Sequence, residues 1–465
     1  MKRLWLILFV IFIGCVSNWK PVTLELKDGT VLKGRITISH VDKDEFIFDY
    51  DLDKKVKMIM LGPQTKEYHE SSWRLPATFE ITTDEKTNYS YLKRKGNKLF
   101  DKVSIPVSTY KQMVTYAPQP FIVFENGVAV NTGPLGYMAK IGLFNMGNNF
   151  SPTYIFNPLP NESILVPGNP IVSNSSVKTN TKRLVVYFGS KESINEGENI
   201  ISIIGKTFPS ELKKAYLPFV EKCASFYNQQ IRNALNEKLT ILLSHQVWEK
   251  DGYSFGGGAQ EFQIIAKSFG NNKNGVDEER IKKMRLFFAH EMAHLWQTNL
   301  GNDDARWFNE GEAELLSLYA MEGLGLITFE DIIRILSENI QESIKGLKNT
   351  SLFSSHLSKH PKLNYTAGLV VVYASMVATG ADGKADDVFG LDKTLSSISQ
   401  NDRQNNPMKS FKQTLSSLGA TQKAIDEIQS FIYTKSVDPI PAYQKLFDAT
   451  GVKYTKVDDK IIITQ

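Results

Sequence analysis

The sequence is poor in cysteine, in net charge and in long apolar runs, and each shortage excludes a class of protein. Its 465 residues include two cysteines and carry a formal net charge of +4. Two cysteines cannot form the disulfide framework of a small secreted domain, and so mild a charge gives no reason to expect a nucleic-acid partner. After the N-terminal segment, no run of about eighteen apolar residues could span a bilayer. With 42% hydrophobic and 22% charged residues, the remainder is ordinary globular material.

The N-terminal segment has the pattern of an export signal. Lys2 and Arg3 form a basic start, and the apolar stretch at 4–13 is too short to cross a bilayer as a helix. It ends in Phe-Ile-Gly-Cys and resembles a bacterial lipoprotein signal. The resemblance implies that Cys15 is lipidated, so that the exported protein is anchored by lipid to a membrane of the bacterial cell envelope. Ordinary signal cleavage and an uncleaved anchor are the alternatives. Cys223 then has no cysteine partner, and we expect it to be a small buried side chain.

The feature that carries chemistry is Ala-His-Glu-Met-Ala-His-Leu-Trp at 289–296. His290 and His294 are four residues apart, so on a helix both imidazoles project from one face, where they can bind a single ion. Glu291 lies beside them, where a carboxylate can take a proton from metal-activated water. The helix is predicted to begin at Asp277, a suitable N-cap. A chance H-E-x-x-H on an ordinary helix is the weaker reading in a chain with seven histidines.

A second motif, Trp-Phe-Asn-Glu-Gly-Glu-Ala-Glu, follows at 307–314, on a predicted helix that starts near Asn309. Glu310 is the preferred third ligand, because it lies at the helix start, nearest the loop from the histidines. Glu314 shares its face and is either the alternative ligand or a partner that orients a ligand histidine. Glu312 points elsewhere. Two histidines and a carboxylate, with an open fourth position and a nearby base, are what a catalytic zinc requires.

These residues resemble the gluzincin zinc metallopeptidases, a peptidase MA-like set, and especially the aminopeptidase and leukotriene-hydrolase-like group. Their pattern is H-E-x-x-H-x-W followed by W-x-N-E-G. The resemblance implies one Zn²⁺ per chain, bound by His290, His294 and Glu310, with Glu291 as general base. It also implies a catalytic tyrosine at Tyr365, in the helix start Tyr-Thr-Ala-Gly, whose hydroxyl would hydrogen-bond the oxyanion. The loop between the two zinc motifs is shorter than in the aminopeptidases, so we expect the geometry on the substrate side of the site to differ from theirs.

A weaker match, Gly-Ala-Gln-Glu at 258–261, lies upstream of the zinc helix. The family has a Gly-Ala-x-Glu strand there that pairs with the substrate, which implies that Gly258, Ala259 and Glu261 bind substrate. In an aminopeptidase, Glu261 would hold the free amino group. The next residue is Phe where the family has Asn, so the sequence does not decide between aminopeptidase and endopeptidase. The simpler readings are a solvent-facing strand residue for Glu261 and a packing residue for Tyr365.

The chain as a whole predicts an α+β multidomain fold, with N-terminal β domains, a thermolysin-like zincin catalytic domain and a mostly helical C-terminal region. The β domains are predicted to be a small SH3-like barrel followed by a β-sandwich-like domain. An edge strand is predicted at 261–266, leading to the zinc helix. The predicted boundaries are 1–15 for the signal peptide, 16–75 for the small β domain, 76–167 for the β-rich domain, 168–182 for a linker, 183–345 for the catalytic domain and 346–465 for the helical region.

The function favoured by the sequence is zinc-dependent hydrolysis of peptide bonds in a peptide or protein substrate. The alternative from another class is a surface lipoprotein that binds a cell-wall or protein partner and has an inactive or structural zinc site. Glu291 favours catalysis, because a structural zinc needs no base. Hydrolysis of a non-peptide substrate is a third reading, kept open by the leukotriene-hydrolase resemblance.

Overall fold

The computed structural model describes residues 32–62, 72–84, 89–109, 121–132, 138–141, 144–145, 150–179, 184–231, 235, 237–248, 252–260, 262–271, 275–301, 305–354 and 360–464. The chain divides into two compact units. Unit 1 comprises Met1–Ser210 and Glu237–Gly275, and unit 2 comprises Glu211–Asn236 and Val276–Gln465. The predicted export signal lies outside the described residues.

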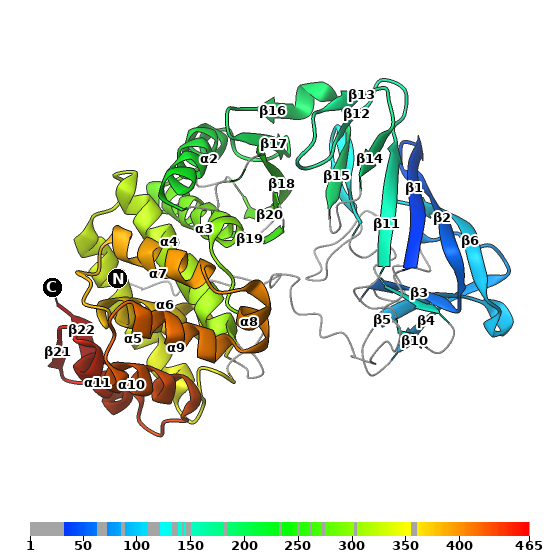
Figure 1. Cartoon of the computed structure of the whole chain (residues 1–465). Coiled ribbons are helices and arrows are strands. Elements are labelled where there is room, and N and C mark those ends of the chain that lie inside the picture. Colours follow the sequence, from blue (N-terminus) through cyan, green and yellow to red (C-terminus); the bar gives the residue numbers. More distant parts are fainter. Residues whose placement is uncertain are drawn as a thin grey trace. The chain divides into compact units, whose positions relative to one another are not determined.

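Unit 1 begins with a sheet of strand order β14-β11-β1-β2-β6 (Figure 1). Its strands are β1 (Leu32–Asp42), β2 (Glu45–Val56), β6 (Phe100–Ser108), β11 (Phe150–Asn157) and β14 (Val177–Thr179). Along the first part of β2 buried residues alternate with half-buried ones, as expected when one face of a strand packs on a core. β1 pairs with β2 in the antiparallel sense and with β11 in the parallel sense.

Two further sheets share an apolar core with the first one. One has the order β10-β9-β3-β5-β4 and the other β13-β12-β15-β8-β7. The strands of the former are β3 (Met58–Gly62), β4 (Phe79–Asp84), β5 (Tyr89–Arg94), β9 (Met138–Ile141) and β10 (Phe144–Asn145). Those of the latter are β7 (Phe121–Phe124), β8 (Gly127–Asn131), β12 (Ser163–Leu165), β13 (Val172–Ser173) and β15 (Val185–Gly189).

The predicted β-rich N-terminal part is confirmed, but the strands of the two predicted β domains do not form separate sheets. β2, from the expected SH3-like barrel, pairs with β6, from the expected β-sandwich. The segment 168–182, predicted as a linker from its polar composition, contributes β13 and β14. In β14, Val177 and Thr179 are buried on either side of an exposed residue. A strand of three residues is too short for its alternation to show in a sequence.

The last sheet of unit 1 has the order β16-β17-β18-β20-β19. It consists of β16 (Ile194–Glu196), β17 (Ile200–Ile204), β18 (Leu239–Val247), β19 (Tyr253–Gln260) and β20 (Gln263–Gly270). β17, β18 and β20 run parallel, and β19 lies antiparallel on β20 at the sheet edge. The edge strand predicted at 261–266 is therefore wrong by one strand: β20 is internal and β19 is the edge. The apolar residues 264–266 of β20 suit an internal strand of a parallel sheet.

Gln263 connects this sheet to the one that contains β15. Its fully buried side chain accepts a hydrogen bond from the Val185 amide at 2.6 Å and donates one to the Val185 carbonyl at 3.1 Å. The amide side chain thus makes the two bonds that a neighbouring strand would make. Without it, two buried backbone groups of β15 would lose these partners.

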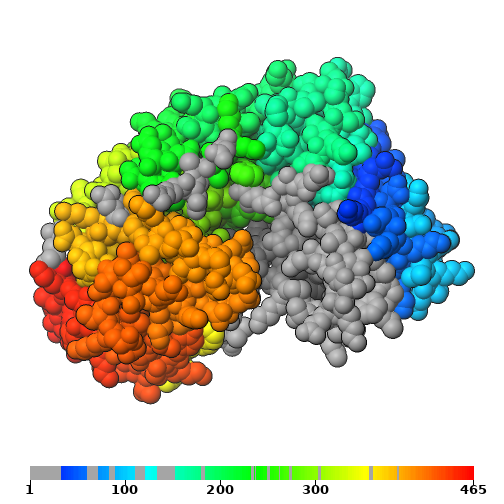
Figure 2. Space-filling model, in the orientation of Figure 1, coloured from blue at the N-terminus to red at the C-terminus, as the bar shows by residue number. Residues whose placement is uncertain are grey.

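Unit 2 is helical. Its helices are α2 (Ser210–Gln230, whose first residue falls in unit 1), α3 (Glu278–Trp296), α4 (Arg306–Gly323), α5 (Phe329–Leu347), α6 (Leu363–Val377), α7 (Ala385–Ser396), α8 (Gln400–Asn405), α9 (Pro407–Ser417), α10 (Gln422–Tyr433) and α11 (Pro439–Thr450). The hairpin of β21 (Tyr454–Val457) and β22 (Lys460–Ile463) follows. The segment from α7 to α11, orange to red, forms one continuous mass (Figure 2). No helix among the described residues is both long and apolar enough to cross a membrane.

The helix that carries the histidines is fixed at both ends. At its start, Asp277 accepts a hydrogen bond from the Arg280 amide at 2.8 Å, which confirms the predicted N-cap. Near its end, Trp296 Nε1 donates to Asn228 of α2 at 2.9 Å. Between them, the Tyr227 hydroxyl donates to the Ala289 carbonyl at 2.9 Å. α3 is therefore held against α2 by polar bonds as well as by its buried apolar face.

Candidate metal centre

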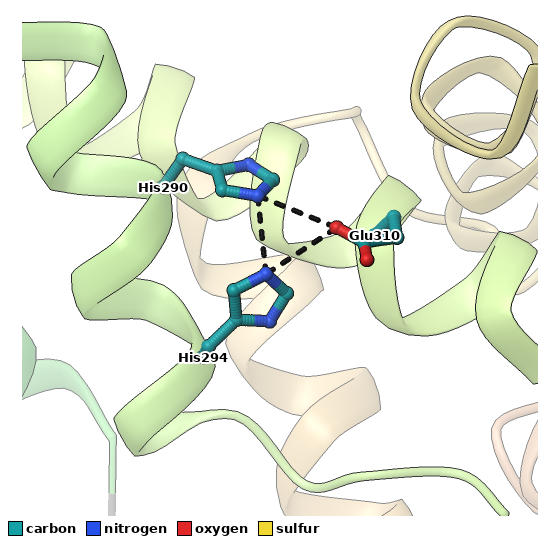
Figure 3. Close-up of side chains that lie close together, drawn as sticks. All are labelled: His290, His294 and Glu310. Carbon is teal, nitrogen blue, oxygen red and sulfur yellow. Dashed lines mark hydrogen bonds and ion pairs between the residues drawn. The ribbon is translucent and has the colours of Figure 1, made fainter. Parts of the chain in front are cut away.

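Two imidazoles and one carboxylate converge between α3 and α4 (Figure 3). The Nε2 atoms of His290 and His294 face each other at 3.1 Å. Glu310 Oε2 lies 3.4 Å from each of these nitrogens. The set is well shielded from solvent, with 8% of His290 and 4% of Glu310 exposed. The structure thus brings together the three residues that the sequence predicted as ligands.

The triangle of atoms fits a tetrahedral cation. Zinc bonds of about 2.0–2.1 Å place neighbouring ligand atoms about 3.3–3.4 Å apart. The observed separations of 3.1 and 3.4 Å are close to this value. Two imidazole nitrogens that face each other must either share one proton or bind a common cation. The donor set of two nitrogens and one oxygen is also one that zinc accepts. Geometry and chemistry therefore both allow a metal ion at the centre of the triangle.

The charges of the cluster favour a cation at the same point. Burial raises the pKa of Glu310, but its contacts with His290 and His294 outweigh burial and hold this pKa below its usual range. Burial lowers the pKa of His290, but the carboxylates of Glu314 and Glu310 more than reverse this and hold it well above its usual value. The Glu310 carboxylate is thus held in its ionised form and attracts positive charge to the imidazole nitrogens.

Glu291 is the carboxylate predicted as general base, and it is almost buried beside the ligand set, with 8% exposed. Burial raises its pKa, and the neighbouring His290 and His294 lower it only in part, so the net shift is upward. A raised pKa makes the carboxylate a stronger base and brings its pKa closer to neutral pH, where one group can serve as proton acceptor and then as proton donor. The position and the environment of Glu291 therefore suit a proton-transfer role.

Two charged side chains hold the ligands from behind. Glu314 Oε1 lies 3.3 Å from His290 Nδ1, as an ion pair rather than an aligned hydrogen bond. Glu314 thus touches the ring nitrogen that faces away from the triangle, so of the two roles predicted for it the geometry favours orienting the histidine. Arg306 Nε lies 3.5 Å from Glu310 Oε1, the carboxylate oxygen that the histidines do not contact. Arg306 was not singled out from the sequence, although its four-residue spacing from Glu310 was a usable signal.

Tyr365 reaches the site because α6 crosses α4 at a pair of glycines. Its ring centroid lies 5.7 Å from that of His290. A Cβ added to Gly368 would lie 2.3 Å from the Trp307 carbonyl oxygen, and one added to Gly311 would lie 2.3 Å from the Gly368 carbonyl carbon. Only glycine permits so close a crossing. The glycines of the two sequence motifs therefore have a joint packing role that the sequence alone did not reveal.

The residues predicted to bind substrate belong to unit 1. Gly258 and Ala259 lie on the edge strand β19, where they are half-buried. Glu261 and the predicted lipidation site Cys15 lie outside the described residues. Their functional roles remain predictions.

Similarity to known proteins is found by comparison of structures and not by comparison of sequences. No protein-family model and no curated protein sequence matches it. Native yeast leukotriene A4 hydrolase aligns with 88% of this chain and 68% of its own, at 13% identity and a TM-score of 0.51.

Two further solved structures score lower. Legionella pneumophila aminopeptidase A matches over 91% of this chain and 51% of its own, at 11% identity and a TM-score of 0.47. A zinc metallopeptidase of the M1 group from Deinococcus radiodurans, in a mutant form, matches over 89% and 96%, at 12% identity and a TM-score of 0.47. The similarity to the yeast enzyme shows the overall fold and confirms the predicted order of N-terminal β-sheets followed by a mostly helical C-terminal part.

Proposed function

We propose that this protein is a zinc-dependent metallopeptidase that hydrolyses peptide bonds. The observation that carries the proposal is the convergence of His290, His294 and Glu310 from consecutive helices, with their ligand atoms within 4.8 Å of one another. Glu291 beside them distinguishes this cluster from a structural metal site, which has no use for a buried base. The fold shared with leukotriene A4 hydrolase, at 13% identity, is consistent with the same reading.

In the proposed reaction, Glu291 takes the proton of the attacking water and later returns it to the leaving amine. A bound Zn²⁺ would supply Lewis-acid polarisation of the scissile carbonyl and would lower the pKa of the water. The Tyr365 hydroxyl donates a hydrogen bond to the oxyanion as the carbonyl becomes tetrahedral. Loss of one such donor costs about 3 kcal/mol, or roughly 10²–10³ in rate.

We propose that β19 aligns the substrate. It is the edge strand of its sheet, with β20 as its only neighbour in the described sheet order. An extended peptide can add to such an edge through backbone hydrogen bonds. We propose that Gly258 and Ala259 make these bonds. Glu261 follows the strand and, by resemblance to the gluzincins, would hold the free amino group of an aminopeptidase substrate.

The test of the catalytic proposal is Glu291→Gln, assayed on a peptide mixture with equal zinc loading of each protein. We expect the variant to bind zinc and to lose at least about 10²-fold in rate, because only the proton acceptor has changed. Glu279→Gln is the matched control, because Glu279 lies on the same helix, is 62% exposed and forms a surface ion pair with Lys283. Wild-type rates in the Glu291→Gln protein would exclude this mechanism.

Exopeptidase and endopeptidase activity are distinguished by the substrate. N-terminal acetylation of the peptides should abolish cleavage if the enzyme is an aminopeptidase, because the ammonium group that Glu261 would bind is gone. Cleavage of acetylated peptides at internal bonds would instead assign an endopeptidase. Zinc binding without cleavage of any peptide would contradict peptidase activity and favour a non-peptide substrate.

We also propose that the protein is anchored to a bacterial membrane through lipid on Cys15. The support is the sequence pattern of a basic start, a short apolar stretch and Phe-Ile-Gly-Cys. Labelling with a radioactive fatty acid, followed by separation of membranes, tests it. The wild-type protein should carry label and sediment with membranes, whereas Cys15→Ser should carry none. Equal labelling of both proteins would exclude Cys15 as the site.

A further inference from the structure

The loop from α3 to α4 is the covalent connection between the helices that carry the two histidines and Glu310, and its first residues are bonded to α4. At its start Gln297 leaves helical geometry, with φ −65° and ψ 152°. The side chain of Gln297 donates to the Asn309 carbonyl at 3.1 Å, and the Leu300 amide donates to Asn309 Oδ1 at 2.9 Å. These bonds tie the first part of the loop to the residue before Glu310.

A second attachment comes from much later in the chain. Asp392, on α7, accepts hydrogen bonds from the backbone amide of Thr298 through Oδ1 and from the Thr298 hydroxyl through Oδ2, the latter at 3.2 Å. The two residues are 94 apart in sequence. Both are buried, with 2% of Asp392 and 4% of Thr298 exposed. The carboxylate therefore binds both donors of the second residue beyond the histidine helix.

The surroundings of this contact are closely packed and partly charged. Gly301, with φ +72°, lies so close to α9 that an added Cβ would be 2.7 Å from the Pro407 side chain. Arg403 on α8 offsets part of the charge of Asp392 electrostatically, and its guanidinium donates to the Leu395 carbonyl of α7 at 3.2 Å. Helices α7 to α9 thus surround the loop that sets the ligand geometry.

We propose that Asp392 is a positioning residue for the metal centre, which it serves by fixing Thr298 and hence the direction in which the chain leaves the histidine helix. This inference rests on the proposed zinc site. Hydrogen bonds to a charged acceptor are among the strongest that a protein makes, and removal of this acceptor would leave a buried amide unpaired. The loop would then relax, and Glu310 would no longer meet both imidazoles in one triangle. Groups that orient metal ligands typically change metal affinity by about 10–100-fold when removed.

The experiment is a zinc titration of metal-free protein in competition with a chromophoric chelator, at a temperature well below unfolding. The variants are Asp392→Ala, which removes both acceptors, and Thr298→Val, which removes only the hydroxyl bond. We expect zinc affinity to fall by about 10–100-fold in the former and by a smaller factor in the latter. Asp392→Asn keeps one acceptor oxygen and should recover part of the loss.

Ser343→Ala is the control for a general loss of stability. It removes a buried hydrogen bond to the Tyr443 hydroxyl, between α5 and α11, and no bond to the loop. Its zinc affinity should equal that of the wild type. Unchanged affinity in Asp392→Ala would overturn the inference, as would an equal loss in Ser343→Ala. If Asp392→Ala does not fold, Thr298→Val decides the question in the same way. Failure of the wild-type protein to bind zinc would instead refute the proposed function.

Discussion

The glycine crossing between α4 and α6 gives a prediction whose size follows from the structure. Gly368→Ala would place a Cβ 2.3 Å from the Trp307 carbonyl oxygen, whereas ordinary contacts lie at 3.4–4 Å. The two helices must therefore separate by about 1 Å, because a backbone carbonyl cannot rotate away as a flexible side chain can. Tyr365 lies one turn before the substituted residue and would move with the helix.

Two opposing effects set the change in stability. Overpacking costs about 1–3 kcal/mol, and replacement of glycine by alanine inside a helix returns up to about 1 kcal/mol. We expect the free energy of unfolding of Gly368→Ala to fall by about 0–3 kcal/mol, as the difference between these terms. The effect on catalysis should be larger, because a displacement of about 1 Å at a reacting group can lower the rate by about 10²-fold.

Gly390→Ala on α7 provides the matched control. It is the same substitution inside a helix, but nothing lies within 4 Å of the added Cβ. The control should gain about 0.5–1 kcal/mol in stability and keep wild-type activity. Urea unfolding and the peptide assay measure both quantities. If Gly368→Ala behaves like Gly390→Ala in both assays, the reasoning about the crossing is refuted.

Three further predictions concern other parts of the chain. Glu314→Gln should weaken zinc binding by about 10–100-fold in a chelator competition, because it loosens His290; unchanged affinity would contradict its orienting role. Gln263→Leu should lower the free energy of unfolding by about 2–4 kcal/mol in urea, because the amide and carbonyl of Val185 both lose buried partners; a neutral result would exclude this link between the sheets. Burial raises the pKa of Asp392 from 3.8 to about 6. Its contribution to stability should therefore fall by about 3 kcal/mol as pH rises from about 4 to about 6, and stay low above that. The free energy of unfolding, measured across this pH range, should decrease less in Asp392→Asn than in the wild type. The same pH dependence in both proteins would contradict this prediction.

The residues that the sequence located correctly are those set by local geometry. The four-residue spacing of His290 and His294 places both rings on one face of any helix, whatever the rest of the fold does. The N-cap Asp277 is also a local signal. The sequence favours Glu310 over Glu314 because it predicts a helix start near Asn309. The helix in fact begins earlier, at Arg306, but Glu310 still lies at both imidazoles and Glu314 lies behind one of them.

The features that the sequence did not reveal depend on contacts between distant segments. β1 pairs with β11 more than a hundred positions away, so the expected SH3-like barrel could not be distinguished from part of a larger sheet by its local alternation. Asp392 is one acid among many on the helical segment, and only the fold brings it to Thr298. The packing role of the glycine pair also depends on a contact between distant segments, because each glycine is explained only by the helix that crosses it.

The central claim is that His290, His294 and Glu310 bind one zinc ion. The most direct measurement is a calorimetric titration of zinc into metal-free wild-type protein and into Glu310→Ala. The wild type should bind one zinc per chain, and the variant, which keeps both imidazoles but lacks the third ligand, should bind zinc far more weakly. Absence of binding in the wild type, or equal affinity in the two proteins, would contradict the account.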